Sequence, residues 1–190
     1  MRTVVLAGGR SQRMGFDKLT ALFAGEPLAR RVARGLRELE PVFVATPRVR
    51  DAIADVPGVQ VVVTEPTAGP SATLALAHEA IPPEMYLAVI ACDLPFLDAG
   101  RVRAFVARVP DDADLAWPTV ADVPGHPVVW SPNARRRIPA LSAADAPMLV
   151  RGDLLLRAAA IDETDDAHVT DVDTADAWAA AERRALRPGD

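Results

Sequence analysis

Short apolar runs of strand length alternate with segments of helical period over residues 1–110, and this alternation limits the chain to few folds. It is typical of a mostly parallel sheet whose strands are connected by helices. The runs at 42–45 and 87–92 are continuously apolar and 59–63 is apolar apart from Gln60, so we expect both faces of these strands to be buried. Strands are predicted at 3–7, 42–45, 59–63 and 87–92, and helices at 27–39, 49–54, 72–81 and 98–109.

The rhythm changes after residue 115. The apolar runs at 115–118 and 126–130 are separated by a polar turn, which is typical of an antiparallel pair. Thr174 is placed to cap the last helix. Further helices are predicted at 133–141, 148–160 and 174–186, and a short strand at 168–172. The sequence therefore predicts a single α/β domain of 190 residues, with helices in two layers around a mostly parallel, mixed sheet.

Composition and charge exclude several classes of protein. A formal net charge of -5 argues against nucleic acid as the main partner, because that binding depends on cations that neutralise phosphates. No apolar stretch approaches the roughly 20 residues that a membrane-spanning helix needs. A single cysteine excludes an intramolecular disulfide, and no basic and apolar leader precedes the first strand. We therefore expect a cytoplasmic protein that binds neither nucleic acid nor membrane, as a monomer or a weak homodimer.

A glycine-rich loop, LAGGRSQRMGFDK at residues 6–18, follows the first strand. In open α/β sheets ligands bind at this carboxyl edge, where glycines let the backbone approach phosphate oxygens and cations attract them. The loop matches neither the dinucleotide-binding fingerprint nor the P-loop, which excludes a typical dehydrogenase and a P-loop kinase. Its glycines and cations are Gly8, Gly9, Gly15, Arg10, Arg13 and Lys18.

Lys18 is the only lysine in the chain, since every other cation among the 21 Lys and Arg residues is arginine. Keeping one lysine inside this loop indicates that a compact ammonium is needed there. The alternative is a surface loop in which the lysine has no particular role.

Asp93 directly follows the apolar run at 87–92, so we expect its carboxylate at the same edge of the sheet as the loop. Mg²⁺ usually takes one or two protein carboxylates and completes its shell with phosphate oxygens and water, so Asp93 is a candidate metal ligand. The alternative, a helix cap, fits Asp98 better, because Asp98 directly precedes the next helix. Cys92 is interpreted as a small buried residue rather than a nucleophile.

The loop at 6–18 and the segment CDLPF at 92–96 resemble the MobA-like NTP transferases, which include molybdenum cofactor guanylyltransferases and cytidylyltransferases. The resemblance implies a three-layer, Rossmann-like (GT-A-like) nucleotidyltransferase fold, with residues 1–110 binding the nucleotide and 111–190 the acceptor. It implies catalytic roles for Lys18, Arg13 and Asp93, with Mg²⁺ on Asp93. Implied nucleotide contacts in the loop are Leu6, Ala7, Gly8, Gly9, Arg10, Ser11, Arg13 and Lys18.

Three further segments resemble parts of the same family. HVTDVDTADAW at 168–178 is similar to the ending of the cytidylyltransferase branch, which implies that Asp173 or Asp171 supplies a second metal contact or a ribose contact. An acid at a helix start is the alternative for Asp173. GPSATLALA at 69–77 is similar to a turn near the nucleobase, although alone it indicates only a turn and caps. GHPVVW at 125–130 is similar to an acceptor-side element, with a core strand as the alternative. Residues implied by these two segments are Gly69, Pro70 and Ser71, with Glu65 just before them, for the nucleotide, and Gly125, His126 and Pro127 for the acceptor.

The segment DAPML at 145–149 lacks the arginine that related cytidylyltransferases carry there, and Arg151 is a candidate substitute. The arginines at 135–137 either meet an anionic acceptor or form a solvated helix face.

The function that these observations predict is Mg²⁺-dependent nucleotidyl transfer, in which Lys18 and Asp93 converge on one bound triphosphate. The resemblance implies an NTP, GTP or CTP, as donor, a small phosphorylated acceptor such as molybdopterin, and release of pyrophosphate. Two alternatives are a nucleotidyltransferase that acts on a sugar phosphate or an isoprenoid-precursor phosphate, and a non-catalytic nucleotide-binding accessory protein.

Overall fold

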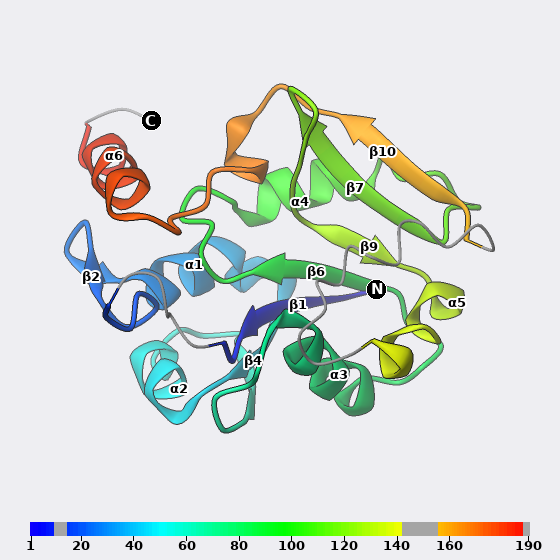
Figure 1. Cartoon of the computed structure of the whole chain (residues 1–190), viewed down its shortest axis with the longest axis horizontal. Helices are drawn as coiled ribbons and strands as arrows, with labels where there is room; N and C mark the ends of the chain where they lie inside the picture. The colour runs from blue at the N-terminus through cyan, green and yellow to red at the C-terminus, as the bar shows by residue number, and fades with distance from the viewer. Residues whose placement is uncertain (10–14, 142–155, 188–190) are drawn as a thin grey trace.

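The computed structural model describes residues 1–9, 15–141 and 156–187. Within them the chain forms an eight-stranded mixed sheet in the order β10-β7-β9-β6-β1-β4-β5, with β8 paired to β7 (Figure 1). The strands are β1 (Arg2–Ala7), β4 (Val42–Ala45), β5 (Gln60–Val63), β6 (Leu87–Ala91), β7 (Leu115–Val120), β8 (Val123–Pro124), β9 (Val128–Trp130) and β10 (Ala158–Asp162).

Helices cover both faces of the sheet and give it three layers, which confirms the predicted fold class (Figure 1). Each face of the sheet carries its own hydrophobic core. Successive residues of β1 point to opposite faces, so Val5 and Ala7 pack into one core while Val4 packs into the other. The helices are α1 (Leu28–Leu36), α2 (Pro47–Ile53), α4 (Ala99–Val106) and α6 (Ala175–Ala185) on the first face, and α3 (Pro70–Ala80) and α5 (Pro132–Arg135) on the second.

The parallel strands predicted from the sequence are confirmed. β1 pairs in parallel with both β4 and β6, and β4 pairs in parallel with β5. The carboxyl ends of these strands therefore lie along one edge of the sheet. The antiparallel pairing predicted for residues 115–130 is also confirmed, because β9 pairs antiparallel with both β6 and β7.

The expectation that residues 59–63 are buried on both faces is wrong. β5 ends the sheet, and its Gln60 and Val63 are exposed. A largely apolar run does not reveal whether a strand has one neighbour or two, and an edge strand is less covered because it lacks the second neighbour.

Two predictions in the last third of the chain are also wrong. Residues 158–160, predicted as the end of a helix, belong to β10, which pairs in parallel with β7; residues 148–155 of that helix lie outside the described residues. Residues 168–172, predicted as a strand, follow the 3₁₀ turn η4 (Asp166–His168), and the N–H groups of Val169 and Thr170 bond to Asp166 O. At 158–160 the pairing with β7 overrides local helical propensity, whereas at 169–170 the local hydrogen bonds to Asp166 O use N–H groups that a strand would need.

The predicted helix at 133–141 is broken into α5 and the 3₁₀ turn η2 (Ile138–Ala140). Pro139 lies inside η2 and cannot donate the backbone hydrogen bond that a continuous helix would need. The sequence analysis also missed a short hairpin, β2 (Leu22–Phe23) with β3 (Glu26–Pro27), whose turn places Ala24 and Gly25 at positive φ. No helix among the described residues is long and apolar enough to cross a membrane.

Candidate active site

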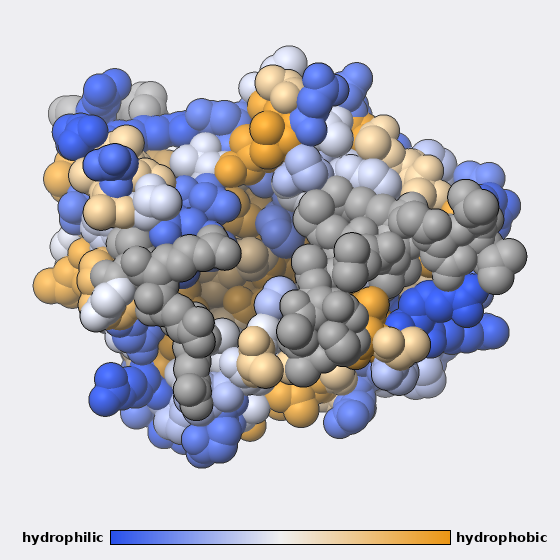
Figure 2. Space-filling model, viewed as in Figure 1, coloured by the Kyte–Doolittle hydropathy of each residue, from blue (hydrophilic) through white to orange (hydrophobic). Residues whose placement is uncertain are grey.

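Three charged side chains from distant parts of the sequence meet at the carboxyl edge of the sheet. Lys18 Nζ lies 2.7 Å from Asp93 Oδ2 and also donates to Asp173 Oδ1. The side chain of Lys18 is 12% exposed, against 20% for Asp93 and 37% for Asp173. Figure 2 shows a hollow near the middle of this face, in the part of the view where Figure 1 shows the arrowheads of β1 and β6.

The backbone fixes Lys18 at the end of the glycine-rich loop. The N–H groups of Thr20 and Ala21 both bond to Asp17 O, which forms a turn around Lys18. Leu19 is buried in the core, and its carbonyl accepts a hydrogen bond from Ala29 N. The main chain on the carboxyl side of Lys18 is therefore anchored, while its long side chain reaches back to the sheet edge.

Strand β6 places Asp93 at the carboxyl edge of the sheet. Cys92 N donates to Leu6 O and extends the pairing of β6 with β1 by one residue, so Asp93 is the first residue beyond the paired strand. Asp98 caps α4 by accepting from Arg101 N, as predicted. Burial raises the pKa of the Cys92 thiol, which agrees with its interpretation as a small core residue rather than a nucleophile.

Asp173 immediately precedes Thr174, which caps α6 as predicted by accepting from Ala177 N. Helix α6 is attached to the start of the chain through Trp178, whose ring lies edge-on to both Phe16 and Phe23. Asp173 therefore reaches Lys18 because the last helix packs against the segment that follows the glycine-rich loop. Asp171, the other candidate for this position, is exposed.

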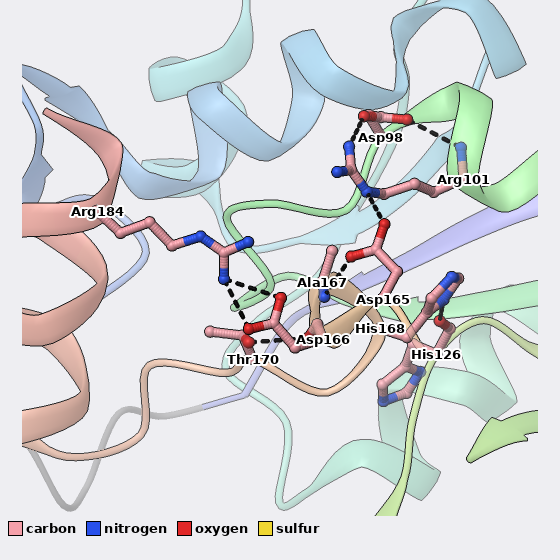
Figure 3. A network of polar contacts seen from close by, with 9 residues as sticks. All are labelled: Asp98, Arg101, His126, Asp165, Asp166, Ala167, His168, Thr170 and Arg184. Carbon is pink, nitrogen blue, oxygen red and sulfur yellow. Dashed lines mark hydrogen bonds and ion pairs between the residues drawn. The ribbon is translucent and has the colours of Figure 1, made fainter. Parts of the chain in front are cut away.

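A network of ion pairs ties the segment before Asp173 to the segment after Asp93, as Figure 3 shows. Asp165 Oδ2 accepts from Arg101 Nε at 2.7 Å, and Arg101 also pairs with Asp98. Arg184 of α6 donates to both carboxylate oxygens of Asp166 at 2.9 Å.

Arg184 reaches the Asp93 side of the site as well. Its guanidinium carbon lies 4.2 Å from the ring centroid of Phe96, three residues after Asp93, while Asp166 lies seven residues before Asp173. Arg184 thus contacts both of the segments that supply carboxylates.

The glycines predicted to approach the nucleotide lie against the loop between β5 and α3. Thr67 N donates to Gly8 O at 2.8 Å, and Gly9 forms a parallel bridge with Thr67. A Cβ on Gly8 would stand 3.2 Å from the Thr73 side chain, whereas one on Gly9 would meet nothing within 4 Å. The structure therefore places Gly8 and Gly9 beside the turn that contains Gly69.

The remaining residues predicted for the nucleotide lie on the same two elements. Leu6 and Ala7 end β1, while Gly69 and Pro70 begin α3. Ser71 is buried in the first turn of α3, and Glu65 is exposed in the loop before it. Arg10, Ser11 and Arg13, together with Arg151 and the segment 145–149, lie outside the described residues.

Gly125, His126 and Pro127 lie beside β6 on the opposite side from β1. The register Val89↔Val128, continued by two residues, places His126 opposite Ala91, two residues before Asp93. His126 Nδ1 lies 3.1 Å from Val89 O, and His126 N donates to His168 O at 2.9 Å. The three residues therefore flank the strand that carries Asp93.

The interpretation of residues 135–137 as a solvated face or an acceptor contact is wrong for Arg135. Its side chain is fully buried, and its guanidinium donates to the carbonyls of His78, Ile81, Pro82 and Met85. Arg135 therefore satisfies the carbonyl end of α3.

The sequence analysis missed Trp178 and Arg184 as residues that position the site. The period of α6 predicts Trp178 on its inward face, but the sequence does not say that the partners of this face lie near residue 16. An arginine in the last turn of a helix is common, so nothing local distinguishes Arg184 from Arg183.

The two carboxylates suit Mg²⁺, which binds hard oxygen ligands and often takes only one or two from the protein. Asp93 and Asp173 already converge on one cation, the Lys18 ammonium. Among the described residues no group of three or more His, Cys, Asp or Glu side chains could hold a metal, so phosphate oxygens or water would complete the coordination.

The neighbouring carboxylates of Asp93 and Asp173 keep the Lys18 side chain positively charged. Burial lowers the pKa of its ammonium, but attraction to Asp93 and hydrogen bonds to Asp173 and Asp93 outweigh burial and raise the pKa above its ordinary value. Lys18 is therefore a cation and not a general base at neutral pH.

This chemistry suits the transfer of a phosphoryl-linked group, which depends on positioning and charge neutralisation more than on a nucleophilic side chain. Together with the three-layer fold it defines a nucleotidyltransferase. A family model for the MobA-like NTP transferase domain matches residues 3–177, and the chain belongs to that family.

A curated relative agrees with this membership, and two solved structures agree with the fold. A protein named molybdenum cofactor guanylyltransferase, from Rhizobium leguminosarum bv. trifolii (strain WSM2304), is 32% identical over 199 residues, which cover 95% of this chain and 90% of the relative. A nucleotidyl transferase from Methanothermobacter thermautotrophicus superimposes with a TM-score of 0.80 at 18% identity, covering 99% of this chain and 98% of that one. Molybdopterin-guanine dinucleotide biosynthesis protein A from Archaeoglobus fulgidus gives 0.73 at 16% identity, covering 97% and 98%.

Proposed function

We propose that this protein transfers GMP from GTP to the terminal phosphate of molybdopterin and releases pyrophosphate. The observation that carries the proposal is the convergence of Lys18, Asp93 and Asp173 at the carboxyl edge of the sheet. The identity of the nucleotide and of the acceptor is supported by relatives that are named molybdenum cofactor guanylyltransferases. The single cysteine favours a cytoplasmic location.

The residues divide the work between the two substrates. Residues 1–110 bind the triphosphate, with Gly8 and Gly9 against it and Lys18 neutralising its charge, helped by Arg10, Ser11 and Arg13 in the same loop. Residues 111–190 bind the acceptor, and Gly125, His126 and Pro127 orient it toward the carboxyl end of β6. Two groups of residues hold the nucleoside. The first lies at the end of β1 (Leu6 and Ala7), and the second lies between β5 and the first turn of α3 (Glu65, Gly69, Pro70 and Ser71).

The reaction needs no covalent enzyme intermediate. An oxygen of the acceptor phosphate attacks the α-phosphorus of GTP, the bond to the β-phosphate oxygen breaks, and pyrophosphate leaves with the electron pair. The attacking phosphate is already ionised, so no general base is required. Asp93 and Asp173 would hold Mg²⁺, which supplies charge neutralisation for the α-phosphate and for the leaving group. Lys18 and Arg13 stabilise the negative charge on the departing pyrophosphate.

A second candidate is the transfer of CMP from CTP to the same acceptor. It is favoured by the similarity of residues 168–178 to the cytidylyltransferase branch, the part of the chain that supplies Asp173.

Release of pyrophosphate from GTP, CTP and ATP, measured with and without molybdopterin, tests both candidates. We expect release with GTP only when molybdopterin is present. Release with CTP instead would replace the first candidate by the second. Binding of nucleotide without release, with every acceptor phosphate offered, would contradict catalysis altogether.

Variants at the charged cluster test the assigned roles. Lys18→Ala should lower turnover about 10²-fold or more, because it removes a preorganised positive charge next to the leaving group. Asp93→Asn should weaken the response to Mg²⁺ by a similar factor. Normal turnover in Lys18→Ala, or an unchanged Mg²⁺ dependence in Asp93→Asn, would reject the corresponding role.

A further inference from the structure

The Lys18 ammonium occupies the position between the two carboxylates that a metal ion needs. Nζ lies 2.7 Å from Asp93 Oδ2 and also donates to Asp173 Oδ1. One positive charge therefore stands between two negative charges in a site where all three side chains are largely or partly shielded from water. Such a charge-assisted arrangement is stronger than a neutral hydrogen bond.

A divalent cation placed between Asp93 and Asp173 competes with this ammonium for the two carboxylates. Mg²⁺ requires near-octahedral oxygen ligands at about 2.0–2.1 Å, so it cannot share the space between the carboxylates with Nζ. Two cations at that separation also repel each other, and partial burial strengthens the repulsion relative to bulk water. A metal ion that bridges Asp93 and Asp173 therefore displaces the ammonium from between them.

We expect the Lys18 ammonium to move by rotation about the bonds of its side chain, while the main chain stays in place. The turn from Asp17 and the buried Leu19 hold its backbone on the carboxyl side, while the four-carbon stem can rotate. Gly8 and Gly9 follow β1 at the same edge of the sheet, so phosphates bound against them offer the ammonium an alternative set of anionic partners.

We propose that Lys18 closes the metal position in the nucleotide-free protein, and that a divalent ion enters only together with a nucleotide whose phosphates take over the ammonium. The part that concerns the nucleotide rests on the proposed function, whereas the closure by Lys18 concerns the free protein alone. Metal and triphosphate thus bind in a coupled step, and the free protein does not hold a metal that lacks its substrate.

Binding of Mn²⁺ to the nucleotide-free protein, followed by the paramagnetic resonance signal of the free ion, tests the closure directly. Wild-type protein should bind Mn²⁺ weakly. Lys18→Met keeps most of the stem but removes the charge, and it should bind Mn²⁺ about tenfold more tightly or better, since the competing cation is gone. Equal affinity of the wild type and Lys18→Met would overturn the proposal.

Two matched variants show whether the gain comes from the charge and from these carboxylates. Lys18→Arg keeps the positive charge and should bind Mn²⁺ as weakly as the wild type. The double variant Lys18→Met with Asp173→Asn should lose the gain. Tight binding by Lys18→Arg, or a gain that persists in the double variant, would contradict the mechanism. Thermal unfolding of each variant verifies that it is folded.

A second measurement uses the fact that Lys18 is the only lysine. Modification by an amine-reactive reagent, followed by mass spectrometry of the peptide, reports whether Nζ stays between the carboxylates. Mn²⁺ alone should leave the rate of modification unchanged in the nucleotide-free wild type, while Asp173→Asn should raise it. Acceleration by Mn²⁺ alone would overturn the proposal.

These results separate the two proposals. If pyrophosphate is released from GTP but Lys18→Met gains no affinity for Mn²⁺, the closure fails and the proposed function stands. If Lys18→Met gains affinity but no acceptor supports pyrophosphate release, the closure stands and the proposed function fails.

Discussion

At the scale of single residues, several positions tolerate only one kind of side chain, and the reason lies in what each contacts. Lys18 is one, because a compact ammonium fits between two carboxylates. Gly125 is another, because a Cβ there would stand 2.3 Å from His168 O. This close approach lets His126 and His168 exchange hydrogen bonds through backbone and ring.

Gly125→Ala should therefore destabilise the protein by about 2 kcal/mol, because an added methyl group in a closed site forces the backbone apart. Urea unfolding measures the change. Gly9→Ala is the matched control, since a Cβ there meets nothing within 4 Å, and it should change the free energy of unfolding much less. Equal effects of the two variants would contradict the contact.

At the scale of elements, buried polar side chains join the ends of helices and strands. Arg135, at the end of α5, donates hydrogen bonds to carbonyl groups at and just after the end of α3. Asp114, just before β7, contacts the segment that follows β9 and the segment that precedes β10. Asp114 accepts hydrogen bonds from Ser131 Oγ, Asn133 Nδ2 and Arg157 N.

Arg135→Met should lower the free energy of unfolding by about 3 kcal/mol, because it leaves buried carbonyls without their charged donor. Chemical denaturation measures this. The neighbouring Arg136 is exposed, and Arg136→Met should have little effect. If Arg135→Met lowered the free energy of unfolding no more than Arg136→Met does, the carbonyls would have found other partners.

Asp114 should make stability depend on pH at the acid end. Burial raises the pKa of Asp114, but hydrogen bonds from Arg157 N, Asn133 and Ser131 outweigh it and hold the pKa below its ordinary value. Because the folded pKa is depressed, this stabilisation is fully present above about pH 4 and is lost as the pH falls through the folded value. Urea unfolding between pH 6 and the onset of acid unfolding should show a shallower pH dependence in Asp114→Asn. An identical slope in that variant would contradict the role of Asp114.

At the scale of the whole molecule, the site depends on the two ends of the described chain meeting. Helix α6 packs on the β2–β3 hairpin through Trp178, and Ala24 N donates to Glu182 Oε1. Arg184 then joins Asp166 to Phe96, so the segments that carry Asp173 and Asp93 are attached to each other away from the charged cluster itself.

Arg184→Ala should raise the Mg²⁺ concentration needed for half-maximal activity about tenfold, because residues that orient metal ligands contribute that much to metal affinity. Arg183→Ala on the same helix is the control and should leave the Mg²⁺ dependence unchanged. A loss of stability without any change in Mg²⁺ dependence would show that Arg184 is only structural.

The sequence alone determined the parallel half of the sheet, the caps at Asp98 and Thr174, and the position of Asp93 at a strand end. These follow from apolar periodicity and from local hydrogen-bonding chemistry, which act over a few residues. The break at Pro139 and the turn at Ala24 and Gly25 were also within reach of local rules, but the sequence analysis did not apply them.

Only the tertiary structure decided which strands lie at the edge, why residues 158–162 pair with β7, and which aspartate meets Lys18. The local sequence does not distinguish Asp171 from Asp173, or Arg135 from Arg136. They differ because burial and long-range contacts depend on where the chain returns, and no local pattern encodes a partner that lies fifty or more residues away in the sequence.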